Sequence, residues 1–243
     1  MTEEMKQLAD QFQCEYSVYE KGSDPAKLEN DYLKALQEWT GKGYYPAILV
    51  ADEYVEDWLD YVFEEGYERE SILKICNDRG KELLQERFRE YLEDYEMDYE
   101  QGLEELIGEE TYGEILLHFS SYLSFDEPVL AEDTLLLKVP AQNPWEIIAW
   151  IPMGGWNECP PPEHMISVCK YWYEAYGAIP AVFTHDEMEF YAPKKLNGVD
   201  SLEAAKEHYA FCVDRVDQGT QSCTLSELAA GLEESERWYF WWD

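Results

Sequence analysis

The stretch AIPAVFTHDEMEFYAP, residues 178–193, decides the fold. Two short runs of apolar and aromatic residues flank a polar turn at His185 and Asp186, which is the pattern of two neighbouring β-strands. The run before it, residues 162–176, repeats apolar residues at helical spacing and is stopped by Gly177. A helix followed by a pair of strands predicts a protein that combines helices with a β-sheet.

Further strands and helices are predicted on both sides of this stretch. The strand candidates are YYPAILV (44–50), TLLLKVP (134–140), WEIIAWIP (145–152) and the closing WYFWWD (238–243). The two runs at 134–140 and 145–152 are expected to be neighbours because the turn between them is short. Helices are expected at 28–39, from the N-cap Asp52 through Val55 and Phe63 to about Gly66, at 201–213, and at 225–232, where Thr224 and Glu227 form a capping box.

These elements predict an α+β fold, a mixed β-sheet flanked by helices, with an acidic helical insertion or layer. The chain divides into three parts: 1–66 as an N-terminal α/β part of the sheet domain, 67–123 as an acidic helical segment, and 134–243 as a second α+β region. Between Asp52 and Glu110 there are 22 acidic residues against 6 basic ones, so this part carries much of the charge.

The composition bounds the class of partner. A hydrophobic fraction of 46% and an aromatic fraction of 15% predict a globular chain despite the net charge of -35. Such an excess of acid makes nucleic acid an improbable partner, because phosphate binding needs clustered Lys and Arg. A basic protein, for example a toxin or nuclease, is a plausible partner, and the alternative is that the acidity only keeps the protein in solution.

The sequence also bears on localisation and cofactors. No run of apolar residues reaches the length of about 18 that a membrane span needs, and none follows Met1, so we expect a cytoplasmic protein without a membrane partner. The six cysteines form no CxxC pair and are expected to be reduced. The four histidines lack metal-ligand spacing and no phosphate-binding glycine loop is present, so no metal or other cofactor is predicted.

Three motifs carry a resemblance to a known family. WEIIAWIPMGGWNECP (145–160), YWYEAYGAIP (171–180) and the terminal WYFWWD together resemble the bacterial family catalogued as domain of unknown function 4253. The resemblance covers roughly residues 134–243. It implies a domain boundary near residue 134 and no particular activity.

The loop GGWNECPPPEH, residues 154–164, has two interpretations. In the first it is a rigid corner, with glycines for a sharp turn and prolines leading into the next helix. In the second Cys159 is a nucleophile near a helix N-terminus with His164 as its base, although His185 or His208 could serve. A third use is a ligand or peptide pocket lined by Trp156, Asn157, Trp241 and Trp242.

A ladder of carboxylates lies in the acidic segment: Glu82, Glu86, Glu90, Asp94 and Asp98. Residues four apart share one helix face, where like charges destabilise an isolated helix by a few tenths of a kcal/mol per pair, roughly. A solvated face is one interpretation, and a partner-binding ridge is the other. The sequence therefore favours a non-catalytic interaction protein, such as an acidic inhibitor or immunity-type protein, over an enzyme or small-ligand binder that uses the 154–164 loop.

Overall fold

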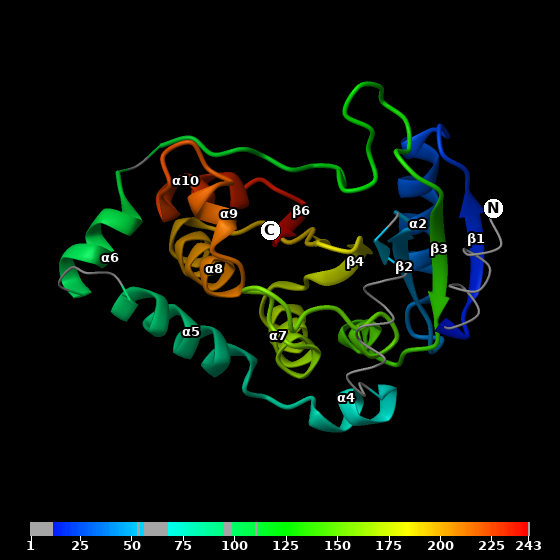
Figure 1. Cartoon of the computed structure of the whole chain (residues 1–243), viewed down its shortest axis with the longest axis horizontal. Helices are drawn as coiled ribbons and strands as arrows, with labels where there is room; N and C mark the ends of the chain where they lie inside the picture. The colour runs from blue at the N-terminus through cyan, green and yellow to red at the C-terminus, as the bar shows by residue number, and fades with distance from the viewer. Residues whose placement is uncertain (1–11, 53, 56–67, 95–98, 110, 243) are drawn as a thin grey trace.

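The computed structural model describes residues 12–52, 54–55, 68–94, 99–109 and 111–242 (Figure 1). The strands are β1 Glu15–Tyr19, β2 Tyr45–Val50, β3 Thr134–Val139, β4 Ile179–Phe183, β5 Glu187–Tyr191 and β6 Arg237–Trp241. The helices are α2 Pro25–Trp39, α4 Arg69–Ile75, α5 Gly80–Asp94, α6 Tyr99–Ile107, the 3-10 helix η1 Pro144–Ala149, α7 Pro162–Tyr176, α8 Gly198–Phe211, α9 Asp214–Asp217 and α10 Leu225–Leu232.

The strands form one mixed sheet in the order β1-β3-β2-β4-β5-β6. The central strands β2 and β4 run parallel, with Ile48 opposite Val182, and the other neighbours pair antiparallel. The predicted α+β fold with a mixed sheet is therefore confirmed. Strands from the N-terminal part of the chain and from the region after residue 134 share this one sheet.

The sheet lies between two apolar clusters because successive side chains of a strand point to opposite faces. In β2, Ala47 and Leu49 face the larger cluster, whereas Ile48 and Val50 face the smaller one. Helices α7 and α8 pack in the larger cluster, and α2 covers the smaller one. Burial on both faces explains why β2 reads as a continuous apolar run.

Several predicted boundaries are confirmed by their caps. Gly177 ends α7 with φ 73°. Helix α2 begins three residues before the predicted start at Leu28, after Asp24, whose side chain accepts the backbone N–H of Ala26. Thr224 accepts the N–H of Glu227 at the start of α10, as a capping box requires. The Glu227 carboxylate accepts N–H groups from the preceding loop at Gln221 instead of that of Thr224.

The predicted strand at 145–152 is wrong. Residues Pro144–Ala149 form the 3-10 helix η1, in which the carboxylate of Glu146 accepts the N–H of Gln142 at 2.8 Å and the amide of Asn143 at 2.8 Å. These two hydrogen bonds join the first turn of η1 to the residues just before Pro144. Ile147 and Ile148 are fully buried here, so their apolar character did not distinguish a helix from a strand.

Two further differences concern the N-terminal third. Strand β1 was not predicted, although it pairs with β3 over its whole length from Glu15 to Tyr19. The helix predicted to carry Trp58, Leu59, Val62 and Phe63 lies outside the described residues. Its proposed cap is described, and the Asp52 carboxylate accepts the N–H of Tyr54 at 2.8 Å.

The segment predicted as helical over 67–123 contains helices only as far as Ile107. Residues 111–123 form no helix and run past α10 and β6 before the chain enters β3 (Figure 1). The backbone of Leu116 accepts N–H groups from Glu236 and Arg237, which fastens this segment to the start of β6. A Cβ added at Gly113 would lie 2.0 Å from a carbonyl oxygen of α10, so the absence of a side chain permits the close approach.

No helix in the described ranges is both long and apolar enough to cross a lipid bilayer.

Candidate functional site

Helix α5 carries the largest part of the predicted partner-binding ladder. Its inner side buries Leu84 and Leu92 in the main core, and at its first residue, Gly80, an added Cβ would meet the Ser167 carbonyl of α7 at 2.2 Å. The helix therefore lies directly on α7, with its opposite side exposed. Glu82, Glu86, Glu90 and Glu93 are on the exposed side.

One basic residue of α5, Arg87, is turned inward. Arg87 donates through Nε to the Ala210 carbonyl at 2.8 Å and through one terminal nitrogen to the Glu158 carbonyl at 2.8 Å. Its charge is used to hold α5 against α8 and the 154–161 loop. Lys81 and Arg89 line a cavity between α5 and α8.

The only basic side chain that contacts the ladder, among the described residues, is Arg79. It pairs with Glu82 at 2.9 Å and Glu86 at 3.2 Å, and both carboxylates stay largely exposed, at 63% and 49%. Glu90 is exposed without an ion pair in the described part of the chain. The side chain of Asp94 and the whole of Asp98 lie outside the described residues, so the ladder can be placed only over its first three members.

The 154–161 loop is a tight corner. Gly154 and Asn157 have φ 101° and 46°, and the N–H of Gly155 donates to the Cys159 carbonyl at 3.2 Å. A Cβ at Gly154 would lie 1.9 Å from the Pro160 carbonyl oxygen. The chain can fold back on itself here because residue 154 has no side chain.

Cys159 is buried within this corner. Its thiol is 4% exposed, and burial raises its pKa well above the ordinary value, whereas a cysteine nucleophile needs a lowered pKa. His164 lies in the first turn of α7, and no hydrogen bond joins its ring to Cys159 in the part of the chain that the structure describes. The geometry matches a structural corner and not a thiol with an adjacent base.

The four residues proposed to line one pocket differ in burial and in their surroundings. Trp242 is 1% exposed and stacks with Phe240 at a ring separation of 6.2 Å. Trp241 borders a different space, a cavity of about 190 Å³ between β6 and α9 whose other lining residues include Arg215 and Tyr239. Trp156 packs on the main core, and neither it nor Asn157 lines the cavity beside Trp241.

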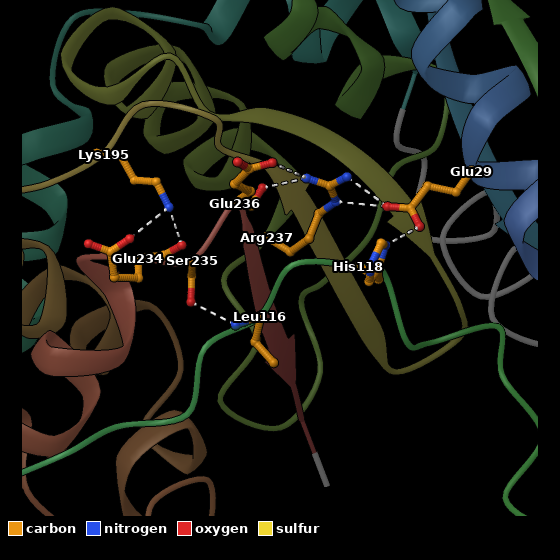
Figure 2. A network of polar contacts seen from close by, with 8 residues as sticks. All are labelled: Glu29, Leu116, His118, Lys195, Glu234, Ser235, Glu236 and Arg237. Carbon is orange, nitrogen blue, oxygen red and sulfur yellow. Dashed lines mark hydrogen bonds and ion pairs between the residues drawn. The ribbon is translucent and has the colours of Figure 1, made fainter.

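A polar network joins the N-terminal helix to the last strand (Figure 2). Arg237, at the start of β6, donates to the carboxylate of Glu29 on α2 at 2.6 Å, with the two side chains only 3% and 10% exposed. His118, in the extended segment formed by residues 111–123, places Nδ1 3.0 Å from the other oxygen of Glu29. Phe119 and Tyr191 cover the guanidinium, each at less than 5 Å. The network connects residues 208 positions apart, and its central ion pair of Glu29 with Arg237 is buried whereas His118 is 80% exposed. The buried pair is structural.

A second buried carboxylate belongs to Glu189 on β5. One oxygen accepts the N–H groups of Ser120 and Ser121 at 2.9 and 2.7 Å, and the other has no hydrogen-bond partner among the described residues. Complete burial raises the pKa of this carboxyl to about 7, although the two N–H groups oppose the shift. Glu189 thereby holds the extended segment against the sheet.

The structure adds one pair of side chains that the sequence did not single out. His185 places Nδ1 3.0 Å from the Asp52 carboxylate at the carboxyl ends of the parallel strands β2 and β4, and the ring of Tyr54 lies against the imidazole. Polar residues at such strand ends often contact ligands in open α/β sheets. The only signal in the sequence is that both residues follow a strand, and it becomes informative only once the parallel pairing is known.

The described residues contain no group of three or more His, Cys, Asp or Glu side chains arranged to hold a metal ion.

Comparison with known proteins supplies the family. A family model described as "Domain of unknown function (DUF4253)" matches residues 135–243. Residues 135–243 are similar to the DUF4253 family. The predicted resemblance is thus confirmed. The matched region includes β3 and everything after it, so the 154–161 loop lies inside this region and α5 precedes it.

Neither the search of curated proteins nor that of solved structures returned a significant match.

Proposed function

We propose that this protein is a non-catalytic binding protein of the cytoplasm that engages a basic protein through the exposed acidic side of α5. An inhibitor or immunity-type role, in which the acidic surface covers a basic surface of a toxin or nuclease, is the class we favour. Nucleic acid is not the proposed partner, because the net charge of -35 repels phosphate.

The observation that supports this proposal is the separation of charge on α5. Glu82, Glu86 and Glu90 are exposed on one side, while Arg87 is turned inward to backbone carbonyls. A row of carboxylates with few neighbouring cations produces a negative field that attracts a basic surface and speeds association. The tight corner around Cys159, with its buried thiol, supports a non-catalytic role.

The test is a matched pair of charge-neutralised variants. The first carries Glu82→Gln, Glu86→Gln and Glu90→Gln. The second carries the same change at three exposed glutamates in and just after α6: Glu104, Glu105 and Glu109. Both lose three negative charges, so any effect of total charge is shared, and only the α5 variant removes the proposed surface.

The two variants and the unmodified chain are used to capture partners from the source cell at low and high salt. We expect a stoichiometric basic protein whose association rate falls with salt and which the α5 variant binds more slowly. Equal association rates for the two variants, or no basic partner in any condition, contradict the proposal.

A further inference from the structure

Helices α5, α6 and α8 line an open cavity of about 390 Å³. This volume falls within the range of small-molecule pockets, roughly 300–1,000 Å³. Its wall combines apolar side chains with cations, and it also includes two carboxylates and one amide. The apolar residues and cations are Leu84, Phe88, Leu103, Lys81, Arg89 and Lys206, and the remaining three are Glu203, Glu207 and Gln85.

The apolar part of the wall is fixed in position. Leu84 is 1% exposed, and Phe88 packs edge-on against the ring of Tyr209, with 6.2 Å between ring centroids. Leu103 contributes from α6 and is partly buried. An apolar group that entered the cavity would displace water from these side chains, which favours binding.

The cationic part is unusual for this chain, which holds only 18 basic residues against 53 acidic ones. Lys81 and Arg89 have no carboxylate at ion-pair distance among the described residues, whereas Lys206 pairs with Glu203 at 2.7 Å. Two cations that lack an ion-pair partner in the described part of the chain thus lie beside an apolar wall, where they can contact an external anion.

The buried acid in the cavity wall, Glu207, attracts Lys81 but forms no ion pair with it among the described residues. The carboxylate of Glu207 faces the cavity, but one oxygen accepts the Tyr171 hydroxyl at 2.7 Å and the other accepts the Trp172 indole N–H at 3.0 Å. Both oxygens therefore have partners already. Lys81 lies over the ring of Tyr171, with its Nζ 5.8 Å from the ring centroid.

We propose that the cavity between α5, α6 and α8 binds a small organic anion that carries an apolar ring or chain. The anionic group lies at the cations Lys81 and Arg89, and the apolar part lies on Leu84 and Phe88. The glutamates of the proposed partner-binding surface do not line this cavity, so the inference does not depend on the proposed function.

The large negative charge of the protein does not exclude such a ligand. At 0.15 M salt the screening length is about 8 Å, so carboxylates farther away than that contribute little. Contacts with charged groups inside a partly enclosed cavity are screened much less. The charges that act on the ligand at short range are then those of the wall, three cations (Lys81, Arg89 and Lys206) against two carboxylates (Glu203 and Glu207).

The experiment uses two probes of nearly the same shape, 2-naphthoate and its neutral analogue 2-naphthamide. Binding of each to the full chain at 0.15 M salt is measured by isothermal titration calorimetry. We expect saturable binding of one naphthoate per chain and binding of the amide at least roughly tenfold weaker, since a charge-assisted contact is worth about that factor.

Variants locate the site. The double change Lys81→Gln and Arg89→Gln should weaken naphthoate binding about tenfold or more, and Leu103→Gln should weaken both probes. The control Lys42→Gln removes a cation from an exposed position after α2, far along the chain from the cavity, and should leave affinity unchanged. Lys81 and Arg89 are exposed, so the double variant is expected to fold, and its unfolding temperature verifies this.

Three outcomes overturn the proposal: no saturable naphthoate binding at millimolar concentration, equal affinity for the amide, or a folded Lys81→Gln, Arg89→Gln variant that binds as well as the Lys42→Gln control.

Discussion

Replacing Glu189 by glutamine should change how the stability of the protein depends on pH. The carboxyl is fully buried on β5, and burial raises its pKa from an ordinary value of 4.5 to about 7. A rise of that size corresponds to about 3 kcal/mol against the charged form in the folded state. At alkaline pH the unmodified protein carries this cost, and at pH 5 it does not.

The sign follows from which state binds the proton. Between about pH 4.5 and 7 the folded chain keeps the proton of Glu189 and the unfolded chain releases it, so this group lowers stability as pH rises through that range. Glutamine is neutral at every pH and can still accept the N–H groups of Ser120 and Ser121. The Glu189→Gln variant should be within about 1–2 kcal/mol of the unmodified protein at pH 5, because both then bury a neutral polar group.

The assay is urea unfolding at intervals from pH 5 to 8.5. The free energy of unfolding of Glu189→Gln, relative to the unmodified chain, should rise by about 2–3 kcal/mol across this range. An exposed acid, Glu127, supplies the control, and Glu127→Gln should show no such change. A Glu189→Gln difference that stays constant with pH refutes the argument that burial holds this proton.

Three other changes test separate parts of the structure. Glu29→Gln removes the buried ion-pair partner of the Arg237 guanidinium and leaves only the half-exposed Glu236 at 3.9 Å. It should lower the free energy of unfolding by about 3 kcal/mol, measured in urea, whereas the paired change Glu29→Leu with Arg237→Met should cost much less. His208 is fully buried without a ring hydrogen bond among the described residues, and burial lowers its pKa well below the ordinary value. Below about pH 6.5 the unfolded chain therefore binds a proton at this residue that the folded chain does not bind. His208→Phe removes this difference and should stabilise the protein more at pH 5 than at pH 8 in the same assay. Cys159 should react with iodoacetamide at pH 6 more slowly than free cysteine, because its thiol is buried and its pKa is raised, and a faster reaction followed by mass spectrometry would restore the nucleophile hypothesis.

The elements that the sequence predicted well are those whose ends carry local signals. Gly177 stops α7 and Thr224 caps α10, and each acts within a few residues of its own position. The strand pair β4 and β5 was recognised for the same reason, since its turn is adjacent in sequence. The sequence is sufficient to predict an element when the residues that end it or pair with it are close along the chain.

The elements that were missed depend on partners far along the chain. Strand β1 is defined by its pairing with β3, more than a hundred residues later. The apolar residues of η1 would be buried whether the segment formed a strand or a helix, so their burial does not reveal the conformation. The hydrogen bonds that Gln142 and Asn143 donate to the Glu146 carboxylate favour the helix. The ion pair of Glu29 with Arg237, and the contact of Asp52 with His185, likewise exist only after the sheet has assembled.

The arrangement of charge on α5 is not what folding alone requires. Like charges four residues apart destabilise a helix by a few tenths of a kcal/mol per pair, roughly, and Arg79 relieves only the pair formed by Glu82 and Glu86. The cations that do stabilise α5 act elsewhere, as Arg87 does when it binds two backbone carbonyls of neighbouring segments. Neutralising the acidic side should therefore raise the stability of the fold slightly while it slows the binding of a basic partner. A variant that lost binding because it misfolded would show lower stability and weaker binding together. Higher stability with slower binding therefore identifies a docking surface.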